Sequence, residues 1–276
     1  MLRRDLHRVV AHEEVGPYTL LRVARGDLEP GIPGQFFMLQ PPGRLLPRPM
    51  SLCLAPSGEL GFLIDPVGPG TRALCALARG DELAVLGPLG NGFRLDVRRP
   101  LLVGGGIGIA PLPFLSDRLG GPRALLGFRS ALHAQAAELV PNAEVVLDPT
   151  YVTDVIPPGY DVLACGPEPM LAAVRRLEPA AQLAWEAPMA CGYGACYGCV
   201  VEIDGELRRL CVDGPVLVGA ASHASRTREG AATLALGASS VAPVASGYEG
   251  SLRPSESGVS RLASTNRAEG GPRRAA

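Results

Sequence analysis

Four cysteines in the last third of the chain constrain its fold more than any other feature. They follow the pattern C-x4-C-x2-C with one further cysteine downstream: Cys191, Cys196, Cys199 and Cys211. This spacing is typical of a [2Fe–2S] cluster, whose four thiolates close around a small inorganic core. Glycine permits the positive φ angles and close approaches that such a loop needs, and Gly192, Gly194 and Gly198 lie between the thiols. The sequence therefore predicts a tight cluster-binding loop.

The segment between the third and fourth cysteines predicts a β-hairpin. Its centre, Asp204-Gly205, is a strong hairpin turn signal, so the chain is expected to return to the cluster at Cys211. A structural zinc ion is one alternative, although zinc sites usually pair C-x2-C knuckles instead of placing three cysteines in one glycine-rich loop. A disulfide framework is a weaker alternative, because the N-terminal residues do not resemble an export signal.

The composition bounds the remaining possibilities. With 276 residues, 47% of them hydrophobic, the chain can form two compact domains or three small ones. A net charge of −1 predicts no bulk attraction to nucleic acid. The uncharged run from Pro100 to Ser116 is rich in glycine and proline and falls short of the roughly 20 residues that span a membrane. We therefore expect a soluble, cytoplasmic protein without membrane association.

Two regions with different patterns precede the cysteines. Between about residues 5 and 98, short β-like runs separated by Gly and Pro turns predict a small antiparallel β-barrel. These runs are Tyr18–Val23, Gln35–Leu39, Met50–Leu54, Leu60–Ile64 and Glu82–Leu86. From Pro100 onward, apolar strands alternate with helical segments, which predicts a parallel nucleotide-binding sheet. Its expected strands are Leu101–Val103, Ala124–Phe128, Glu144–Leu147 and Asp161–Ala164, with a helix from about Pro111 to Leu119.

The expected fold class is therefore a multidomain β and α/β protein. Residues 1–98 form the antiparallel β-barrel, 99–180 the parallel-sheet domain, and 181–217 a small C-terminal [2Fe–2S] domain. Residues 218–276 contain few large apolar side chains and are expected to be a disordered tail.

Two motifs in the barrel region are candidates for binding an anion. Arg48-Pro49-Met50-Ser51 lies next to a strand, and an arginine fixed beside a proline can present its planar fork to a pyrophosphate. In Val67-Gly-Pro-Gly-Thr71, glycines bare consecutive backbone N–H groups, and a helix is expected to begin at the favoured N-cap residue Thr71. Alone, the first motif is more simply interpreted as surface residues. A third segment, Leu86–Phe93, suits a structural turn and a ligand contact equally well.

Two turns of the parallel sheet are candidates for binding a nicotinamide nucleotide. Gly104-Gly-Gly-Ile-Gly108 bares backbone at a helix N-terminus, although it lacks the third glycine of the dinucleotide fingerprint. Cys165-Gly166-Pro167 follows a strand, so its thiol is expected at the carboxyl edge of the sheet, where ligands bind. A turn without a ligand and core packing of the cysteine remain the alternatives. The four histidines have no acidic or cysteine partner at useful spacing, so hydrolysis has no visible machinery.

Taken in order, these motifs resemble those of the ferredoxin-NADP reductase superfamily. Over about residues 5–217 the chain is similar to the electron-transfer (iron–sulfur flavoprotein) subunits of NAD-dependent class 1B dihydroorotate dehydrogenases, and Cys211-Val-Asp-Gly-Pro-Val216 strengthens the match. The resemblance implies an oxidoreductase that uses FAD, a [2Fe–2S] cluster and NAD(H). It assigns FAD to Arg48, Pro49, Met50, Ser51, Gly70 and Thr71; NAD(H) to Gly104, Gly105, Gly106, Gly108, Gly166 and Pro167, with Cys165 as the catalytic residue at the nicotinamide; and the cluster to Cys191, Cys196, Cys199 and Cys211.

The resemblance also implies a partner. Electrons would pass to the FMN of a separate dihydroorotate dehydrogenase catalytic subunit, in a heterotetramer of two catalytic and two electron-transfer subunits that serves pyrimidine biosynthesis. One departure is the segment Leu147–Asp154, which is shorter than the family pattern and lacks its Asp-Gly-Ser loop.

Two other functions remain open. A small flavoprotein subunit of an NADPH-dependent ferredoxin oxidoreductase or sulfide dehydrogenase would share nearly every motif. Arg129 is a candidate contact for a 2′-phosphate, but one arginine does not decide between NADPH and NADH. The alternative from another class is a non-catalytic zinc-binding or interaction protein.

Overall fold

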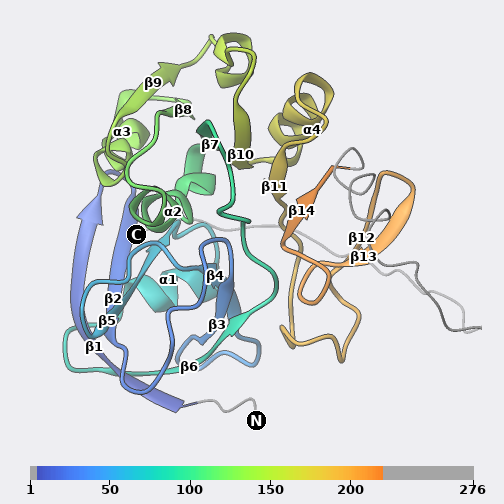
Figure 1. Cartoon of the computed structure of the whole chain (residues 1–276). Helices are drawn as coiled ribbons and strands as arrows, with labels where there is room; N and C mark the ends of the chain where they lie inside the picture. Colours follow the sequence, from blue (N-terminus) through green and yellow to red (C-terminus); the bar gives the residue numbers. More distant parts are fainter. Residues whose placement is uncertain (1–4, 220–276) are drawn as a thin grey trace, which may run out of the picture. The chain divides into compact units, whose positions relative to one another are not determined.

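The strands of the described residues form two six-stranded sheets and a separate two-stranded hairpin (Figure 1). The computed structural model describes residues 5–219. The tail expected to be disordered comprises residues 218–276. Val218 is the last residue of a strand, and residues 220–276 lie outside the described residues. Within the described residues, no helix is long and apolar enough to cross a membrane.

The first sheet is antiparallel and forms the predicted barrel, coloured blue to teal in Figure 1. Its strands, in spatial order, are β4 (Arg48–Ser51), β3 (Phe36–Gln40), β6 (Glu82–Leu89), β1 (Asp5–Val15), β2 (Tyr18–Ala24) and β5 (Glu59–Ile64). The N–H of Cys53 donates to Gly61 O at 2.8 Å, and the N–H of Gly61 donates to Leu54 O at 2.8 Å. These bonds join the chain after β4 to β5 and close the barrel, which removes the exposed sheet edges. The helix α1 (Pro69–Cys75) follows β5.

Apolar side chains from opposite walls fill the barrel. Phe37 of β3 and Phe62 of β5 are fully buried and meet edge to face, with ring centroids 5.6 Å apart. This is the preferred geometry for aromatic pairs. Strand β1 was not among the expected strands. Its residues alternate between buried and exposed and include several charged side chains, so it lacks the apolar run that identifies the other strands.

The second sheet carries the predicted parallel strands. Its spatial order is β14 (Val216–Val218), β11 (Gln182–Ala184), β10 (Asp161–Cys165), β7 (Pro100–Gly105), β8 (Ala124–Phe128) and β9 (Ala143–Leu147). The connections contain α2 (Leu112–Arg118), α3 (Ala131–Ala134) and α4 (Glu168–Leu177), with 3₁₀ turns at Gly106–Ile109, Gln135–Leu139 and Val152–Val155. Strands β7 and β10 are buried almost throughout, as expected for parallel strands covered on both faces. The predicted fold class is confirmed.

The second sheet includes strands that lie beyond residue 180, the expected end of its domain. Strand β11 and all but the last residue of β14 lie in the range 181–217 that the sequence assigns to the cluster domain, yet both strands pair within the second sheet. Strand β14 runs antiparallel to β11, so the chain leaves this sheet, forms the cysteine region and returns to it. Each of these strands is only three residues long, too short for its apolar pattern to separate it from the cysteine region.

The third unit is the hairpin formed by β12 (Val200–Ile203) and β13 (Glu206–Arg209). Asp204 and Gly205 form its turn with φ angles of +55° and +77°. The predicted hairpin and its turn are therefore confirmed.

Candidate functional site

The four cysteines lie as two pairs. The Sγ atoms of Cys199 and Cys211 are 3.2 Å apart and buried. Cys196 lies close enough to Cys191 to lower the pKa of the Cys191 thiol. Backbone N–H groups also approach the sulfurs: Gly194 N lies 3.1 Å from Cys211 Sγ, and Gly198 N lies 3.5 Å from Cys196 Sγ. Such N–H groups stabilise thiolates, the form that binds metal.

This arrangement fits a two-iron cluster better than a single ion. Among residues 5–219, no three His, Cys, Asp or Glu side chains gather as a mononuclear metal site requires. Two pairs of thiols can instead supply two ligands to each iron of a [2Fe–2S] cluster. Burial raises the pKa of Cys191, but N–H groups of Tyr193, Cys196 and Ala195 outweigh it and bring the pKa to about 6. The residues present therefore fit a [2Fe–2S] cluster.

Backbone conformation explains two of the three loop glycines. Gly192 and Gly194 have φ angles of +83° and +89°. A Cβ atom on Gly192 would lie 2.6 Å from Met38 Cγ of the barrel, and one on Gly194 would lie 2.7 Å from Val212 Cγ2. Gly198 has no such φ; Tyr197 adopts +58° instead, with the Arg209 guanidinium 5.1 Å from its ring centroid. Gly198 therefore does not supply a positive φ angle, but it does lie close to a thiol, since a Cβ atom there would lie 3.6 Å from Cys196 Sγ.

The cysteine region packs directly on the barrel. Cys199 and Cys211 share a buried apolar cluster with Phe36, Met38 and Leu89. The side chain of Asn91 donates to Val212 O at 3.0 Å and to Asp213 O at 3.1 Å, and its N–H donates to Gly214 O. The segment Leu86–Phe93 therefore holds the chain beside Cys211 and is structural. Cys196, by contrast, is exposed, so one thiol of the set reaches the surface.

The candidate flavin residues meet at β4 and α1. The Arg48 guanidinium donates to Leu46 O at 2.9 Å and Pro47 O at 3.1 Å. A Cβ atom on Gly70 would lie 2.6 Å from Arg48 Cζ, so the bare backbone of α1 lies against the guanidinium. Pro49, Met50 and Ser51 continue β4 and pair with β3. The structure thus brings the two barrel motifs together.

The start of α1 differs from the prediction at Thr71. The helix begins at Pro69, with Gly68 as its N-cap, because proline is preset for the first helical position. Thr71 lies one turn inside and its Oγ1 accepts from Gly68 N at 3.0 Å. Thr71 therefore stabilises the helix start from the N3 position and is not the N-cap.

A cavity of about 630 Å³ opens at the carboxyl edge of the second sheet. Its lining comes from the turns after β7, β8, β9 and β10 and from two barrel residues: Gly105, Gly106, Arg129, Asp148, Thr150, Tyr151, Pro167, Met170, Tyr18 and Asp65. This is where open α/β sheets bind ligands. Burial, followed by the charge of Asp65, raises the pKa of Tyr18 to about 12, so its phenol stays protonated.

The glycines of the β7 turn have different roles. Gly106 has φ +56° and no atom within 4 Å of where its Cβ would be, so its backbone is bare at the cavity. A Cβ on Gly104 would meet Leu112 at 2.7 Å, and one on Gly108 would meet Cys165 O at 2.7 Å. These two glycines permit close packing and do not line the cavity. A Cβ on Gly166 would meet Met170 Cε at 2.5 Å, so Gly166 too is closely packed.

Cys165 ends β10 but points into the core, not the cavity. Burial, then the charge of Glu186, raises the pKa of its thiol far above the ordinary range, so it stays neutral. Burial also raises the pKa of Glu186, although part of that residue remains exposed. Sequence reasoning missed Glu186, because a single carboxylate after a three-residue strand forms no motif. The structure brings it close to Cys165.

Arg129 lies at the cavity in a small hydrogen-bonded set. Its Nε donates to His133 Nε2 at 2.8 Å, and His133 Nδ1 lies 2.8 Å from Ser130 Oγ. Because Nε2 accepts from Arg129, the proton of a neutral His133 belongs on Nδ1, which donates to Ser130. The shortened segment after β9 also reaches this cavity through Asp148, Thr150 and Tyr151.

The fold and site define a ferredoxin-reductase-like protein with an added iron–sulfur segment. The NADH-dependent reduced ferredoxin–NADP oxidoreductase structure aligns with a TM-score of 0.67 and 24% identity, over 78% of this chain and 88% of that chain. A sequence profile described as the iron–sulfur cluster binding domain of dihydroorotate dehydrogenase B matches residues 186–221, which contain all four cysteines of the motif.

Curated relatives give the family. The dihydroorotate dehydrogenase B (NAD(+)) electron transfer subunit of Geobacillus sp. (strain WCH70) is 35% identical over 249 residues, covering 78% of this chain and 97% of the relative. The subunit of the same name from Shouchella clausii (strain KSM-K16) is 37% identical over 242 residues, covering 75% and 93%. The chain belongs to this family of electron transfer subunits.

Proposed function

We propose that this chain is the electron-transfer subunit of an NAD-dependent dihydroorotate dehydrogenase. It passes electrons between NAD(H) and a separate catalytic subunit by way of FAD and a [2Fe–2S] cluster. The observation that carries the proposal is the pairing of the four thiols on the barrel wall, with Cys196 exposed. Membership of the family supplies the reaction, the oxidation of dihydroorotate to orotate in pyrimidine biosynthesis.

The barrel residues fit a flavin nucleotide. Arg48 and the bare backbone at Gly70 meet at one place, which suits the pyrophosphate of FAD. Pro49, Met50 and Ser51 continue the same strand and would hold the rest of the flavin nucleotide, and Thr71 stabilises the adjoining helix start. Bound FAD supplies the exchange between a two-electron hydride and single electrons.

The cavity at the second sheet fits the nicotinamide nucleotide. Gly106 presents bare backbone for its pyrophosphate, whereas Gly105 lines the cavity with its Cβ position only 2.6 Å from Met170 Sδ. Pro167 also lines the cavity and is the candidate contact for the nicotinamide. Gly104, Gly108 and Gly166 shape these turns by allowing close packing. Cys165 is a neutral thiol buried in the core beside Glu186, so a catalytic role would require the nicotinamide to approach the end of β10. Asp148, Thr150 and Tyr151 take the place of the family loop that this chain lacks.

The cluster provides the exit for single electrons. Cys191, Cys196, Cys199 and Cys211 hold it, and the exposed Cys196 faces the surface at which a partner would bind. We expect that partner to carry FMN and to assemble with this chain as two catalytic and two electron-transfer subunits in the cytoplasm.

Two other functions are less well supported. The small flavoprotein subunit of an NADPH-dependent ferredoxin oxidoreductase or sulfide dehydrogenase shares the fold, but a fold match at 24% identity does not carry function. A zinc-binding protein requires three or four ligands around one ion, and the described cysteines lie as two pairs.

The division of roles is tested with Cys196→Ser in the complex with the catalytic subunit. We expect loss of dihydroorotate-dependent NAD⁺ reduction, while NADH oxidation by an artificial dye persists, because the dye accepts electrons from the flavin. Cys75→Ser is the matched control, since Cys75 lies on α1 away from the cluster, and both activities should persist. Equal loss of both activities in Cys196→Ser would contradict the proposal.

A further inference from the structure

The hairpin β12–β13 connects the two buried cysteines. Cys199 directly precedes β12, and Cys211 follows β13 after one intervening residue, Leu210. The N–H of Leu210 donates to Cys199 O at 3.2 Å, so the base of the hairpin and the thiol pair are held together. Any tilt of the hairpin therefore moves the ends of the chain that carry both sulfurs.

The hairpin has little support from other strands. Among residues 5–219 its two strands pair only with each other, and an isolated two-stranded hairpin is marginally stable in water. Val201 and Ile203 pack against the apolar cluster that contains Cys199 and Cys211. Leu207, near the tip, is 74% exposed. The tip therefore needs another contact to stay in place.

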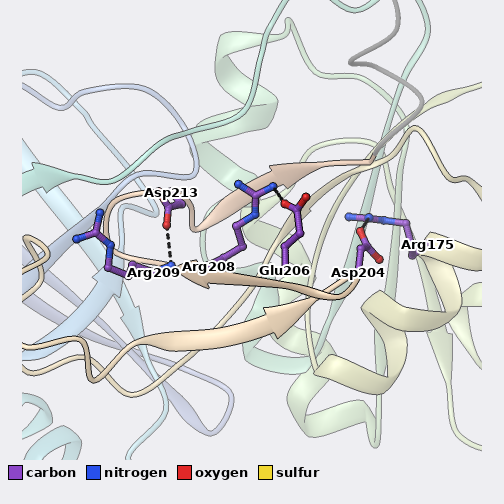
Figure 2. Close-up of polar contacts among 6 residues, drawn as sticks. All are labelled: Arg175, Asp204, Glu206, Arg208, Arg209 and Asp213. Atoms are coloured by element: carbon purple, nitrogen blue, oxygen red, sulfur yellow. Dashed lines mark hydrogen bonds and ion pairs between the residues drawn. The ribbon is translucent and has the colours of Figure 1, made fainter. Parts of the chain in front are cut away.

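Arg175 of α4 supplies that contact by pairing with Asp204 in the hairpin turn (Figure 2). The Arg175 side chain is only 15% exposed, whereas Asp204 is 58% exposed. The remaining guanidinium nitrogens, Nε and Nη2, are buried with no hydrogen-bond partner among the described residues. Asp204 is the one counter-charge that Arg175 has among the described residues, and its own exposure keeps the contribution of the pair modest.

The other two polar contacts in this region, one ion pair and one hydrogen bond, are local. Arg208 pairs with Glu206 on the same strand, and Asp213 accepts from the N–H of Arg209 beside Cys211 (Figure 2). Of the three contacts, only the one made by Arg175 joins the cysteine region to the domain of the second sheet. Helix α4 also carries Met170, which lines the nucleotide cavity. One rigid helix thus links the cavity to the tip of the hairpin.

We propose that Arg175 is a positioning residue that holds the hairpin, and through it the Cys199–Cys211 pair, against the nucleotide-binding domain. Its part in electron transfer rests on the function proposed above: a hairpin fixed at both ends keeps the cluster at a constant separation from the flavin. Arg175 itself is not among the residues that line the nucleotide cavity.

The test is hydrogen exchange of peptides covering residues 200–209 in the purified full chain. Asp204→Asn keeps a residue that accepts positive φ and removes only the charge. We expect Arg175→Met and Asp204→Asn each to speed exchange by up to about five-fold, as loss of a partly exposed ion pair allows. The double variant should show no more than either single one.

Two arginines serve as controls. Arg176 is the exposed neighbour of Arg175 in the same helical turn, and Arg208 forms the local pair on the hairpin. Arg176→Met and Arg208→Met should leave the exchange of the hairpin tip unchanged. In stopped-flow reduction by NADH, Arg175→Met should slow the cluster phase and leave the flavin phase unchanged.

Unchanged exchange in Asp204→Asn, or additive effects in the double variant, would overturn the positioning role. If the unaltered protein shows no reduction by NADH, the proposed function fails, and the exchange data still decide the role of Arg175.

Discussion

Gly192→Ala should destabilise the cluster loop more than its backbone angle alone predicts. At φ +83° a residue with a Cβ atom loses about 1–2 kcal/mol. That Cβ would also lie 2.6 Å from Met38 Cγ and 2.9 Å from Met38 Sδ. Met38 is fully buried, so relief requires repacking, which typically costs about 1–3 kcal/mol. We expect a total loss of about 2–5 kcal/mol in the free energy of unfolding.

Gly205→Ala is the matched control. Gly205 has φ +77°, but no atom lies within 4 Å of its Cβ position, so only the backbone cost of about 1–2 kcal/mol applies. Urea unfolding can be followed by the fluorescence of Trp185, the single tryptophan, which packs beside the cysteine region. Adding Met38→Ala to Gly192→Ala should cost less than the sum of the two single losses. Equal losses in the two glycine variants, or strict additivity with Met38→Ala, would refute the reasoning.

Two further perturbations test the anchoring of the cysteine region and the burial of a core thiol. Asn91→Ala removes two hydrogen bonds to the chain beside Cys211, so it should lower the free energy of unfolding by about 1–2 kcal/mol and speed iron loss to a chelator. Asn142→Gly, which removes a hydrogen bond to Gly121 O, is the control and should not affect iron retention. Equal iron loss in the two variants would contradict this. Burial raises the pKa of Cys53 to about 12, so between pH 9 and 12 only the unfolded thiol ionises. Above about pH 9, this group should therefore lower the free energy of unfolding by about 1.4 kcal/mol per pH unit. In urea unfolding, Cys53→Val should lose stability less steeply with pH than the unaltered protein. Parallel pH curves for the two proteins would contradict this.

The sequence predicted those turns and strands whose conformation is set by residues adjacent in the chain. Asp204-Gly205 determines its hairpin because few other residues accept two consecutive positive φ angles. The apolar runs of the second sheet are visible because parallel strands are buried on both faces. Strand β1 escaped detection because one of its faces is solvated and charged.

The contacts between distant segments could not be predicted from one sequence. Nothing in the pattern indicates that Gly192 lies against Met38, or that Asn91 holds residues 212 and 213. A glycine-rich turn likewise does not reveal which glycine faces a ligand. The structure separates Gly106, which is bare at the cavity, from Gly108, which allows two turns to approach each other.

The visible spectrum of the purified chain under anaerobic conditions, before and after addition of NADH, tests the central claim most directly. Flavin and iron are assayed on the same sample. An electron-transfer subunit with both cofactors should show mixed flavin and iron–sulfur absorption that bleaches on addition of NADH. A colourless protein containing stoichiometric zinc, or a flavin that does not respond to NADH, would contradict it.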